Sequence, residues 1–178
     1  AKNNTLEIKW LFVGFYIQIV MRLKDCHSFT DFRELARRRL PSPIFNYIDG
    51  AADDERTYDR NTKSFEDCDL VPNVLRGVQD IDMSVKILGK KLDMPIYCSP
   101  TALQRVFHHQ GENAVAAAAD KYGTLFGVSS LGTVSLADVR KRYPGPQCYQ
   151  FYFHKDRELN KVMLENAKNA DVDIMMLT

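Results

Sequence analysis

The sequence predicts an α/β fold in which parallel strands alternate with helices. Short apolar segments of strand length recur about every 25 residues from Met94 onward, and helical patterns fill the intervals between them. This alternation is typical of a parallel sheet, because each crossover between parallel strands needs a connection of helix size. The 178 residues are 45% hydrophobic and 26% charged, which is the composition of a globular domain that buries a core.

A parallel sheet of this kind is either an open nucleotide-binding sheet or a closed barrel. Neither glycine-rich phosphate motif, GxGxxG or GxxxxGK[ST], follows a predicted strand, so the nucleotide-binding classes lose their main support. A complete (β/α)8 barrel takes roughly 250 residues. Four predicted strands precede the end of the chain at Thr178, which directly follows the last of them. We therefore predict the N-terminal half of a (β/α)8 TIM barrel, truncated after its fourth strand.

Helices and a hairpin are expected ahead of this sheet. Ser28 and Asp31 have the spacing of a capping box before apolar residues at helical intervals, and Pro41 would end that helix. Residues 44–61 predict a second helix, a Gly-Ala turn and an acidic-to-basic stretch. Residues 83–95 alternate around a glycine and predict a β-hairpin.

The repeating region should contain four strands with helices between them. Alanine-rich or capped segments predict the helices, and short apolar runs predict the strands. The predicted strands are residues 94–100, 124–130, 148–153 and 172–178, and the predicted helices are residues 111–123, a segment opened by Ser135 and Asp138, and residues 156–170.

The N-terminal residues have a different character. The apolar stretch from Trp10 to Met21 is far shorter than the roughly 20 residues of a membrane span, and no small-residue cleavage site follows it. We interpret residues 1–20 as a non-native extension, with Met21 as the expected start and residues 21–178 as the barrel portion. A peripheral membrane anchor is the alternative. We therefore expect a cytoplasmic protein, with peripheral association at the inner membrane as the second possibility.

Composition argues against several classes of function. The formal net charge is +1, which gives no broad attraction to nucleic acid. The four cysteines form no CxxC pair, a pattern that fits buried thiols in a reducing compartment and indicates neither a disulfide framework nor a zinc site. Adjacent His108 and His109 cannot easily face one ion from regular structure, so we predict no metal site.

Neutral polar residues follow successive predicted strands, where the chemistry of a barrel gathers. A flat heteroaromatic ring edged with N–H and carbonyl groups, such as a flavin, would suit them, because amides and hydroxyls can both donate and accept. The alternative is that these residues merely cap the helices that follow. The residues are Pro100-Thr101-Ala102, Ser129-Ser130, Gln150 with Tyr152, and Thr178.

Several segments together resemble one enzyme family. The segments "YIDGAADDERTYDRN", "MPIYCSPTALQ", "GVSSLGTVSLADV", "YQFYFHKDR" and "IMMLT" are similar, in order, to those of the FMN-dependent L-2-hydroxy acid oxidases and dehydrogenases, which include glycolate oxidase, flavocytochrome b2 and bacterial L-lactate dehydrogenase. The resemblance covers about residues 32–178. It implies FMN as cofactor and oxidation of a small L-2-hydroxy acid to the 2-keto acid, with quinone, cytochrome or oxygen as the unknown electron acceptor.

The resemblance also implies roles for individual residues. Tyr47 would bind the substrate carboxylate, and the catalytic Tyr152 would place its hydroxyl beside the C2 oxygen. Leu131 stands where glycolate oxidases have a large aromatic residue, which favours L-lactate; a glycolate-type oxidase is the alternative. The residues expected to contact FMN are Pro100, Thr101 and Ala102 along the ring, and Ser129, Gln150 and Thr178 at its pyrimidine edge.

Part of the family's machinery is expected beyond the fourth strand. The histidine base, the substrate-binding arginines and a lysine near the flavin would all follow Thr178, so we expect the 178-residue chain by itself to be inactive. The full-length protein could form a homo-oligomer. A different possibility is that the chain is a non-catalytic half-barrel that serves in binding or assembly, since an open half-barrel leaves two unpaired edges.

Overall fold

The computed structural model describes residues 22–178, so the predicted extension at residues 1–20 lies outside the described part. The chain divides into two compact units, Ala1–Ser42 and Pro43–Thr178. In the described part of the first unit, a short 3-10 helix, η1 (Leu23–Asp25), precedes α1 (Phe29–Arg39). The predicted capping box of α1 is confirmed, because Ser28 accepts the Asp31 N–H while Asp31 accepts the Ser28 N–H. Among the described helices, none has the length and apolarity needed to cross a membrane.

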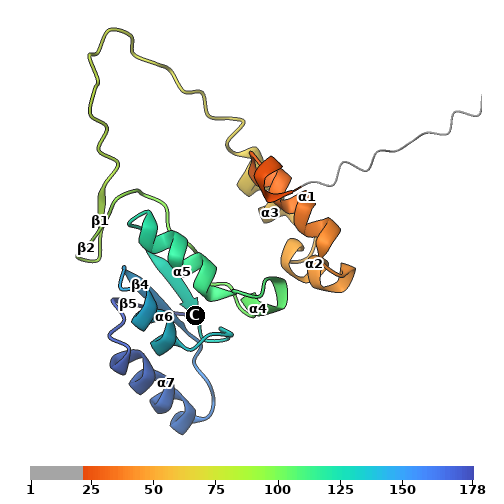
Figure 1. Cartoon of the computed structure of the whole chain (residues 1–178), viewed down its shortest axis with the longest axis vertical. Helices are drawn as coiled ribbons and strands as arrows, with labels where there is room; N and C mark the ends of the chain where they lie inside the picture. The colour runs from red at the N-terminus through yellow and green to blue at the C-terminus, as the bar shows by residue number, and fades with distance from the viewer. Residues whose placement is uncertain (1–21) are drawn as a thin grey trace, which may run out of the picture. The chain divides into compact units, whose positions relative to one another are not determined.

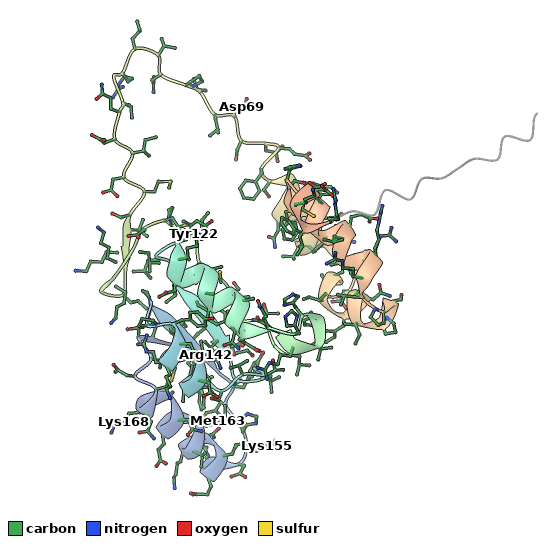
Figure 2. All side chains as sticks on the ribbon, viewed as in Figure 1. Asp69, Tyr122, Arg142, Lys155, Met163 and Lys168 are labelled. Atoms are coloured by element: carbon green, nitrogen blue, oxygen red, sulfur yellow. The ribbon has the colours of Figure 1, made fainter. Side chains whose placement is uncertain are left out.

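The second unit opens with two helices and a long extended segment. The structure has α2 (Ser42–Asp49) and α3 (Arg56–Lys63), so the acidic-to-basic stretch forms a helix of its own. Residues 66–84 then contain no helix or strand. Large apolar side chains along this segment, around Asp69 in Figure 2, are exposed.

The predicted hairpin is present as β1 (Val85–Ile87) and β2 (Lys90–Leu92), which pair antiparallel. The two residues of the turn, Leu88 and Gly89, have φ values of 46° and 84°. Positive φ at both central positions is the geometry of a type I′ turn, whose twist matches that of the paired strands.

The hairpin is followed by a parallel sheet whose strands lie in sequence order, with β3 (Phe126–Ser129) next to β4 (Gln147–Phe151) and β4 next to β5 (Ile174–Leu177). The helices are α4 (Gln104–Phe107), α5 (Glu112–Lys121), α6 (Leu136–Arg142) and α7 (Arg157–Asn169), and Figure 1 shows α5, α6 and α7 along one face of the sheet. The α/β class and the strand-helix alternation are therefore confirmed. Parallel neighbours in sequence order are also the arrangement that a half-barrel requires.

The two faces of the sheet pack against different partners. Phe126 and Val128 of β3 pack against alanines of α5 and Val139 of α6, and Tyr149 and Phe151 of β4 pack against Ala167 of α7. On the opposite face, Cys148 packs with Leu92 of the hairpin and with Leu125. The alternation along β4 thus separates a helix-covered face from the face that would line the barrel interior.

The predicted strand at residues 94–100 is present only as an isolated parallel bridge between Cys98 and Phe126. Its backbone nevertheless continues the ladder, because the Cys98 N–H donates to Leu125 O at 3.0 Å and the Gly127 N–H donates to Cys98 O at 2.8 Å. The segment lies at the edge of the sheet and carries Pro95 and Pro100, which have no N–H to donate. The extended strand expected from the sequence is therefore shortened to this bridge.

Two further expectations need correction. The third predicted strand, residues 148–153, ends at Phe151, so Tyr152 and Phe153 follow β4, and Phe153 is exposed. The cysteines are free thiols, as expected from the absence of CxxC pairs, but of the four only Cys148 is buried and Cys68 is exposed. The exposed Cys68 lies just after α3, where no packed element covers it.

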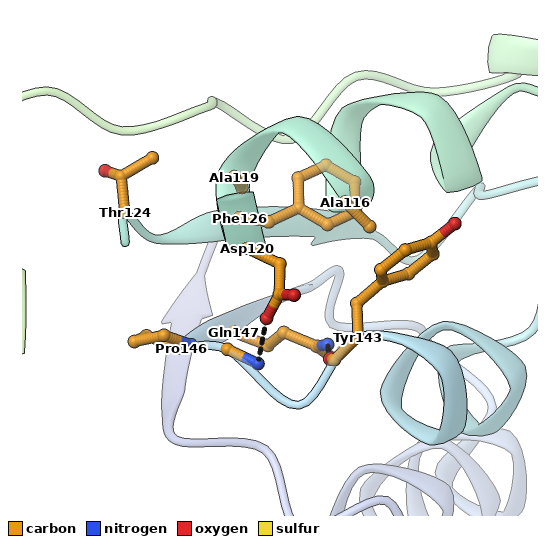
Figure 3. Close-up of a pocket in the computed structure, with 9 residues that line it drawn as sticks. Ala116, Ala119, Asp120, Thr124, Phe126, Tyr143, Pro146 and Gln147 are labelled. Atoms are coloured by element: carbon orange, nitrogen blue, oxygen red, sulfur yellow. Dashed lines mark hydrogen bonds between the residues drawn. The ribbon is translucent and has the colours of Figure 1, made fainter. Parts of the chain in front are cut away.

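The amino ends of the strands are held by ion pairs and close packing. Asp173, just before β5, accepts from Lys90 of the hairpin at 2.6 Å, from Arg140 of α6 at 3.0 Å and from the Gln147 N–H at 2.8 Å. Asp120 and Gly145 line the adjacent pocket in Figure 3, where the Gly145 N–H donates to Asp120 Oδ1 at 3.0 Å. These contacts join the hairpin, α5, α6 and the start of β4 at this end of the sheet.

Candidate functional site

The carboxyl ends of the strands bring three of the predicted residues together. Ser129 of β3 is the direct register partner of Gln150 on β4, and both belong to the face that is not covered by helices. Met176 of β5 is the next partner in the same row. Thr178 follows two positions later, and its N–H donates to Phe151 O at 3.2 Å, which keeps it in line with the end of β4.

An amide and a phenol stand side by side at the end of β4. The Gln150 side-chain N–H donates to the Tyr152 hydroxyl at 3.3 Å. Tyr152 is 37% exposed, so its ring stands partly open to solvent. The alternation along β4 places Tyr149 on the opposite face, where it packs with Phe151 and Ala167 of α7.

The hydroxyl of Ser129 has a defined direction. The side chain is 4% exposed, and its oxygen accepts the Leu131 N–H at 3.1 Å. A serine hydroxyl can donate one hydrogen bond while it accepts, so its own proton stays available to a nearby acceptor. The β3 loop, which we define as residues 129–133, thus presents a hydrogen-bond donor at the end of β3.

The loop before α4 is fixed from two directions. In this α4 loop, defined as residues 100–105 and so including the first two residues of α4, the Gln104 amide donates to Thr101 O at 3.2 Å. Leu103 has a φ of 56°, a left-handed backbone that is uncommon for a leucine, and its N–H donates to Leu131 O at 3.1 Å. Pro100, Thr101 and Ala102 are half-buried. The α4 loop and the β3 loop are therefore joined backbone to backbone.

Gly127 allows the α4 loop to approach the sheet closely. A Cβ built at Gly127 would lie 2.6 Å from Pro100 Cδ and 3.0 Å from Cys98 O. Neither atom belongs to a flexible side chain, so only glycine fits here without a backbone shift. The position of Pro100 beside the row of Ser129 and Gln150 depends on this missing Cβ.

The two predicted substrate residues outside the sheet are placed separately. Tyr47 of α2 stacks on Phe107 of α4, with ring centroids 6.2 Å apart and planes 11° apart. Its side chain is 64% exposed. Leu131 is exposed in the β3 loop. The structure thus brings Ser129, Gln150 and Tyr152 together at the strand ends. Tyr47 instead lies on α2, against Phe107 of α4.

Burial affects the titration of several groups near the site. It raises the pKa of the thiols of Cys98 and Cys148 and of the Tyr149 phenol. These groups therefore stay protonated at neutral pH. Among the described residues, no group of three or more His, Cys, Asp or Glu could hold a metal ion.

One buried charged residue beside this site was not predicted from the sequence. Glu112, the first residue of α5, is fully buried, and its carboxylate accepts from both the N–H and the hydroxyl of Thr133 in the β3 loop. A glutamate in the first turn of a helix usually reflects the helix dipole, so the sequence offers no signal for burial. The partner lies 21 positions away in the chain, and only the fold shows it.

Comparison with known proteins identifies the family. Residues 36–178 match the sequence profile of the FMN-dependent dehydrogenases. The chain belongs to this family. It is 38% identical over 149 residues to an L-lactate dehydrogenase of Vibrio parahaemolyticus, covering 84% of this chain and 39% of that protein. It is 35% identical to glycolate oxidase 5 of Oryza sativa subsp. japonica, covering 84% of this chain and 40% of that protein.

Solved structures agree with this assignment. A lactate oxidase from Pediococcus acidilactici superimposes with a TM-score of 0.77 at 30% identity, covering 83% of this chain and 42% of that one. A mandelate oxidase superimposes with a TM-score of 0.76 at 28% identity, covering 83% and 44% of the two chains. The chain thus spans about 40% of the length of the relatives that it matches.

The family depends on FMN, and the geometry of the strand ends fits part of this cofactor. Ser129 has a free hydroxyl proton, Gln150 offers an amide, and neither residue carries a charge, as the neutral edge of a flavin ring requires. No lysine or arginine lies among residues 99–102, 129–131 or 150–153, the strand ends that face the site. These strand ends therefore fit the ring of FMN and offer no cation to its phosphate.

Proposed function

We propose that the full-length protein that contains this chain oxidises an L-2-hydroxy acid, with L-lactate favoured, to the corresponding 2-keto acid, using FMN. The observation that carries the proposal is the pair at the end of β4, where the Gln150 amide lies 3.3 Å from the Tyr152 hydroxyl. Relatives named L-lactate dehydrogenase and glycolate oxidase support the reaction class. Pediococcus acidilactici lactate oxidase supports the fold of the site.

In this proposal the residues of the strand ends hold the two reactants. FMN would accept the two electrons of the oxidation. Ser129, Gln150 and Thr178 would bond the pyrimidine edge of its ring, and the backbone from Pro100 to Ala102 would lie along the ring. The Ser129 hydroxyl suits a carbonyl acceptor because Leu131 already occupies its oxygen.

The substrate would lie on the open side of these residues. Tyr152 would donate to or accept from the C2 oxygen, since a phenol can do either. Tyr47 would bind the carboxylate, which requires α2 to contribute to the same site. The exposed Leu131 would leave room for the methyl group of L-lactate, where a larger aromatic side chain would favour glycolate. In this proposal the base that takes the substrate proton would come from another part of the full-length protein, and the electrons would pass from FMN to a quinone, a cytochrome or oxygen.

The test compares two tyrosines of one segment in the FMN-loaded full-length protein. Tyr152→Phe removes the hydroxyl at the proposed substrate position, and we expect kcat/KM for L-lactate to fall at least about tenfold, the factor for one lost hydrogen bond to a reacting group. Tyr149→Phe makes the same chemical change on the helix-covered face, where the ring is buried, and should leave kcat/KM unchanged.

Rates that fall equally in both variants would contradict the assignment of Tyr152. A wild-type protein that binds FMN but is reduced by none of L-lactate, glycolate and mandelate would refute the proposed substrate class. Stopped-flow measurement of flavin reduction under anaerobic conditions separates these outcomes, because it reports the substrate half-reaction whatever the electron acceptor is.

A second candidate function is a non-catalytic half-barrel that associates with itself or a partner. The observation that favours it is β5, an edge strand whose Leu177 is 71% exposed and whose Met175 is also exposed. Under the first proposal the isolated 178-residue chain is inactive and neither binds FMN tightly nor forms a defined oligomer. Cooperative unfolding of a discrete dimer, observed by sedimentation equilibrium and denaturant titration, would favour the non-catalytic half-barrel.

A further inference from the structure

The buried carboxylate of Glu112 has an unusual set of partners. It is 0% exposed, its Oε1 accepts the Thr133 N–H at 2.7 Å, and its Oε2 accepts the Thr133 hydroxyl at 2.6 Å. Burial would raise the pKa of Glu112, but these two bonds and the backbone N–H groups of Glu112 and Gln104 hold it below the ordinary value. The carboxylate therefore stays ionised with neutral donors at the first turn of α5, where the helix dipole adds to their effect.

Through Thr133, Glu112 reaches both loops of the site. The Thr133 oxygen that donates its proton to Glu112 also accepts the Arg105 N–H from the end of the α4 loop at 3.1 Å. The second link between the loops, from the Leu103 N–H to Leu131 O, lies nearby. The β3 loop and the α4 loop are thus attached to one buried anion.

The packing around this anion leaves little freedom. A Cβ at Gly111 would lie 2.7 Å from Arg105 Cγ and 3.3 Å from Thr133 Oγ1, and the backbone there has a φ of 51°. A Cβ at Gly132 would lie 3.0 Å from Ser129 O. Both glycines let backbone segments meet at distances that a side chain would prevent.

The same loop that Glu112 holds sets the direction of Ser129. The Gly132 N–H donates to Ser129 O at 3.0 Å, and the Leu131 N–H donates to Ser129 Oγ at 3.1 Å. Both donors lie between Ser129 and Thr133 in a loop of five residues. A displacement of Thr133 would therefore be transmitted to the Ser129 hydroxyl within one turn.

We propose that Glu112 is a positioning residue that locks the β3 loop to the α4 loop and so fixes where the Ser129 hydroxyl and the Leu131 side chain point. Glu112 touches neither ring nor substrate, and it acts through Thr133. The role in cofactor binding rests on the proposed function, because Ser129 is a flavin ligand only under that proposal. The locking of the two loops does not rest on it.

The test uses the full-length protein with Thr133→Val, which keeps the shape of the side chain and removes the hydroxyl that links Glu112 to Arg105. Amide hydrogen exchange, followed by NMR or mass spectrometry, should rise about tenfold in both loops, because a bond to a buried charge is lost. The FMN dissociation constant should rise by a similar factor. Thr133→Ser, which retains the hydroxyl, should restore both quantities, and Glu112→Gln should give a smaller rise because one oxygen can still accept the Thr133 N–H.

The matched control is Ser135→Ala, which removes the cap of α6 two residues beyond the β3 loop. It should lower the unfolding midpoint without changing exchange in the α4 loop or the FMN dissociation constant. The inference would be overturned if the amide hydrogen-exchange rates of Thr133→Val equalled those of the wild type, or if they rose in the β3 loop alone. A wild-type protein that binds no FMN would instead refute the proposed function, and the exchange measurement would still decide whether Glu112 locks the loops.

Discussion

Replacing Gly127 by alanine should displace the α4 loop from the sheet. The added Cβ would lie 2.6 Å from Pro100 Cδ, 2.7 Å from Pro100 N and 3.0 Å from Cys98 O. An ordinary contact of this kind is about 3.5 to 4.0 Å, so the proline must move by about 1 Å. Such overpacking costs about 1 to 3 kcal/mol. The bond from the Gly127 N–H to Cys98 O, at 2.8 Å, would weaken as well and adds about 1 kcal/mol.

The assay measures both stability and cofactor binding in the full-length protein. We expect the free energy of unfolding in urea to fall by about 2 to 4 kcal/mol, and the FMN dissociation constant to rise, because Pro100 borders the proposed ring site. The control is Gly77→Ala, the same change at a glycine with no atom within 4 Å of the added Cβ and a φ of 61°. Its cost should be about 1 kcal/mol, from backbone strain alone, with FMN binding unchanged.

Equal stability losses in the two variants would refute the argument that close approach, rather than backbone freedom, requires glycine at position 127. A loss of stability at Gly127→Ala without weaker FMN binding would refute the placement of Pro100 against the ring. Gly77 has a positive φ and open space around the added Cβ, whereas Gly127 has close contacts and no positive φ, so a larger loss of stability at position 127 reports the close approach.

Two further changes test the base of the sheet and the substrate pocket. Burial would raise the pKa of Asp173, but Lys90, the Gln147 N–H and Arg140 hold this pKa below its ordinary value. The contribution of Asp173 to the free energy of unfolding is therefore complete above the unfolded pKa, near 3.9. That contribution is lost as the pH falls through the lower folded pKa. Asp173→Asn should cost about 1 to 3 kcal/mol at pH 7 and should flatten the loss of stability below about pH 4, as acid denaturation followed by circular dichroism would show; an unchanged acid limb would contradict this. Leu131→Trp should raise KM for L-lactate relative to glycolate by about tenfold in steady-state assays, and an unchanged ratio would remove Leu131 from the substrate pocket.

The order and type of the elements follow from local sequence. Ser28 and Ser135 accept N–H groups at the starts of α1 and α6, as their spacing predicts, because caps act within one turn. The helix predicted over residues 156–170 is present as α7, and Asp156 caps its start. The hairpin around Gly89 and the strands β3, β4 and β5 also lie where the apolar patterns predict them. The alternation along β4 likewise placed Gln150 and Tyr152 on one face. These features depend on neighbours within a few positions in the chain, so local sequence patterns are enough to predict them.

The sequence by itself determined the α/β class, the helix caps and the residues gathered at the strand ends, since periodicity and capping are local properties. Only the tertiary structure decided that Gly127 must lack a Cβ, that the strand before Pro100 is reduced to a bridge, and that Glu112 is buried against Thr133. Each of these depends on atoms that are 21 or more positions away in the chain, or on which edge of the sheet a segment occupies. Contacts of that kind exist only after the chain has folded, and no local pattern encodes them.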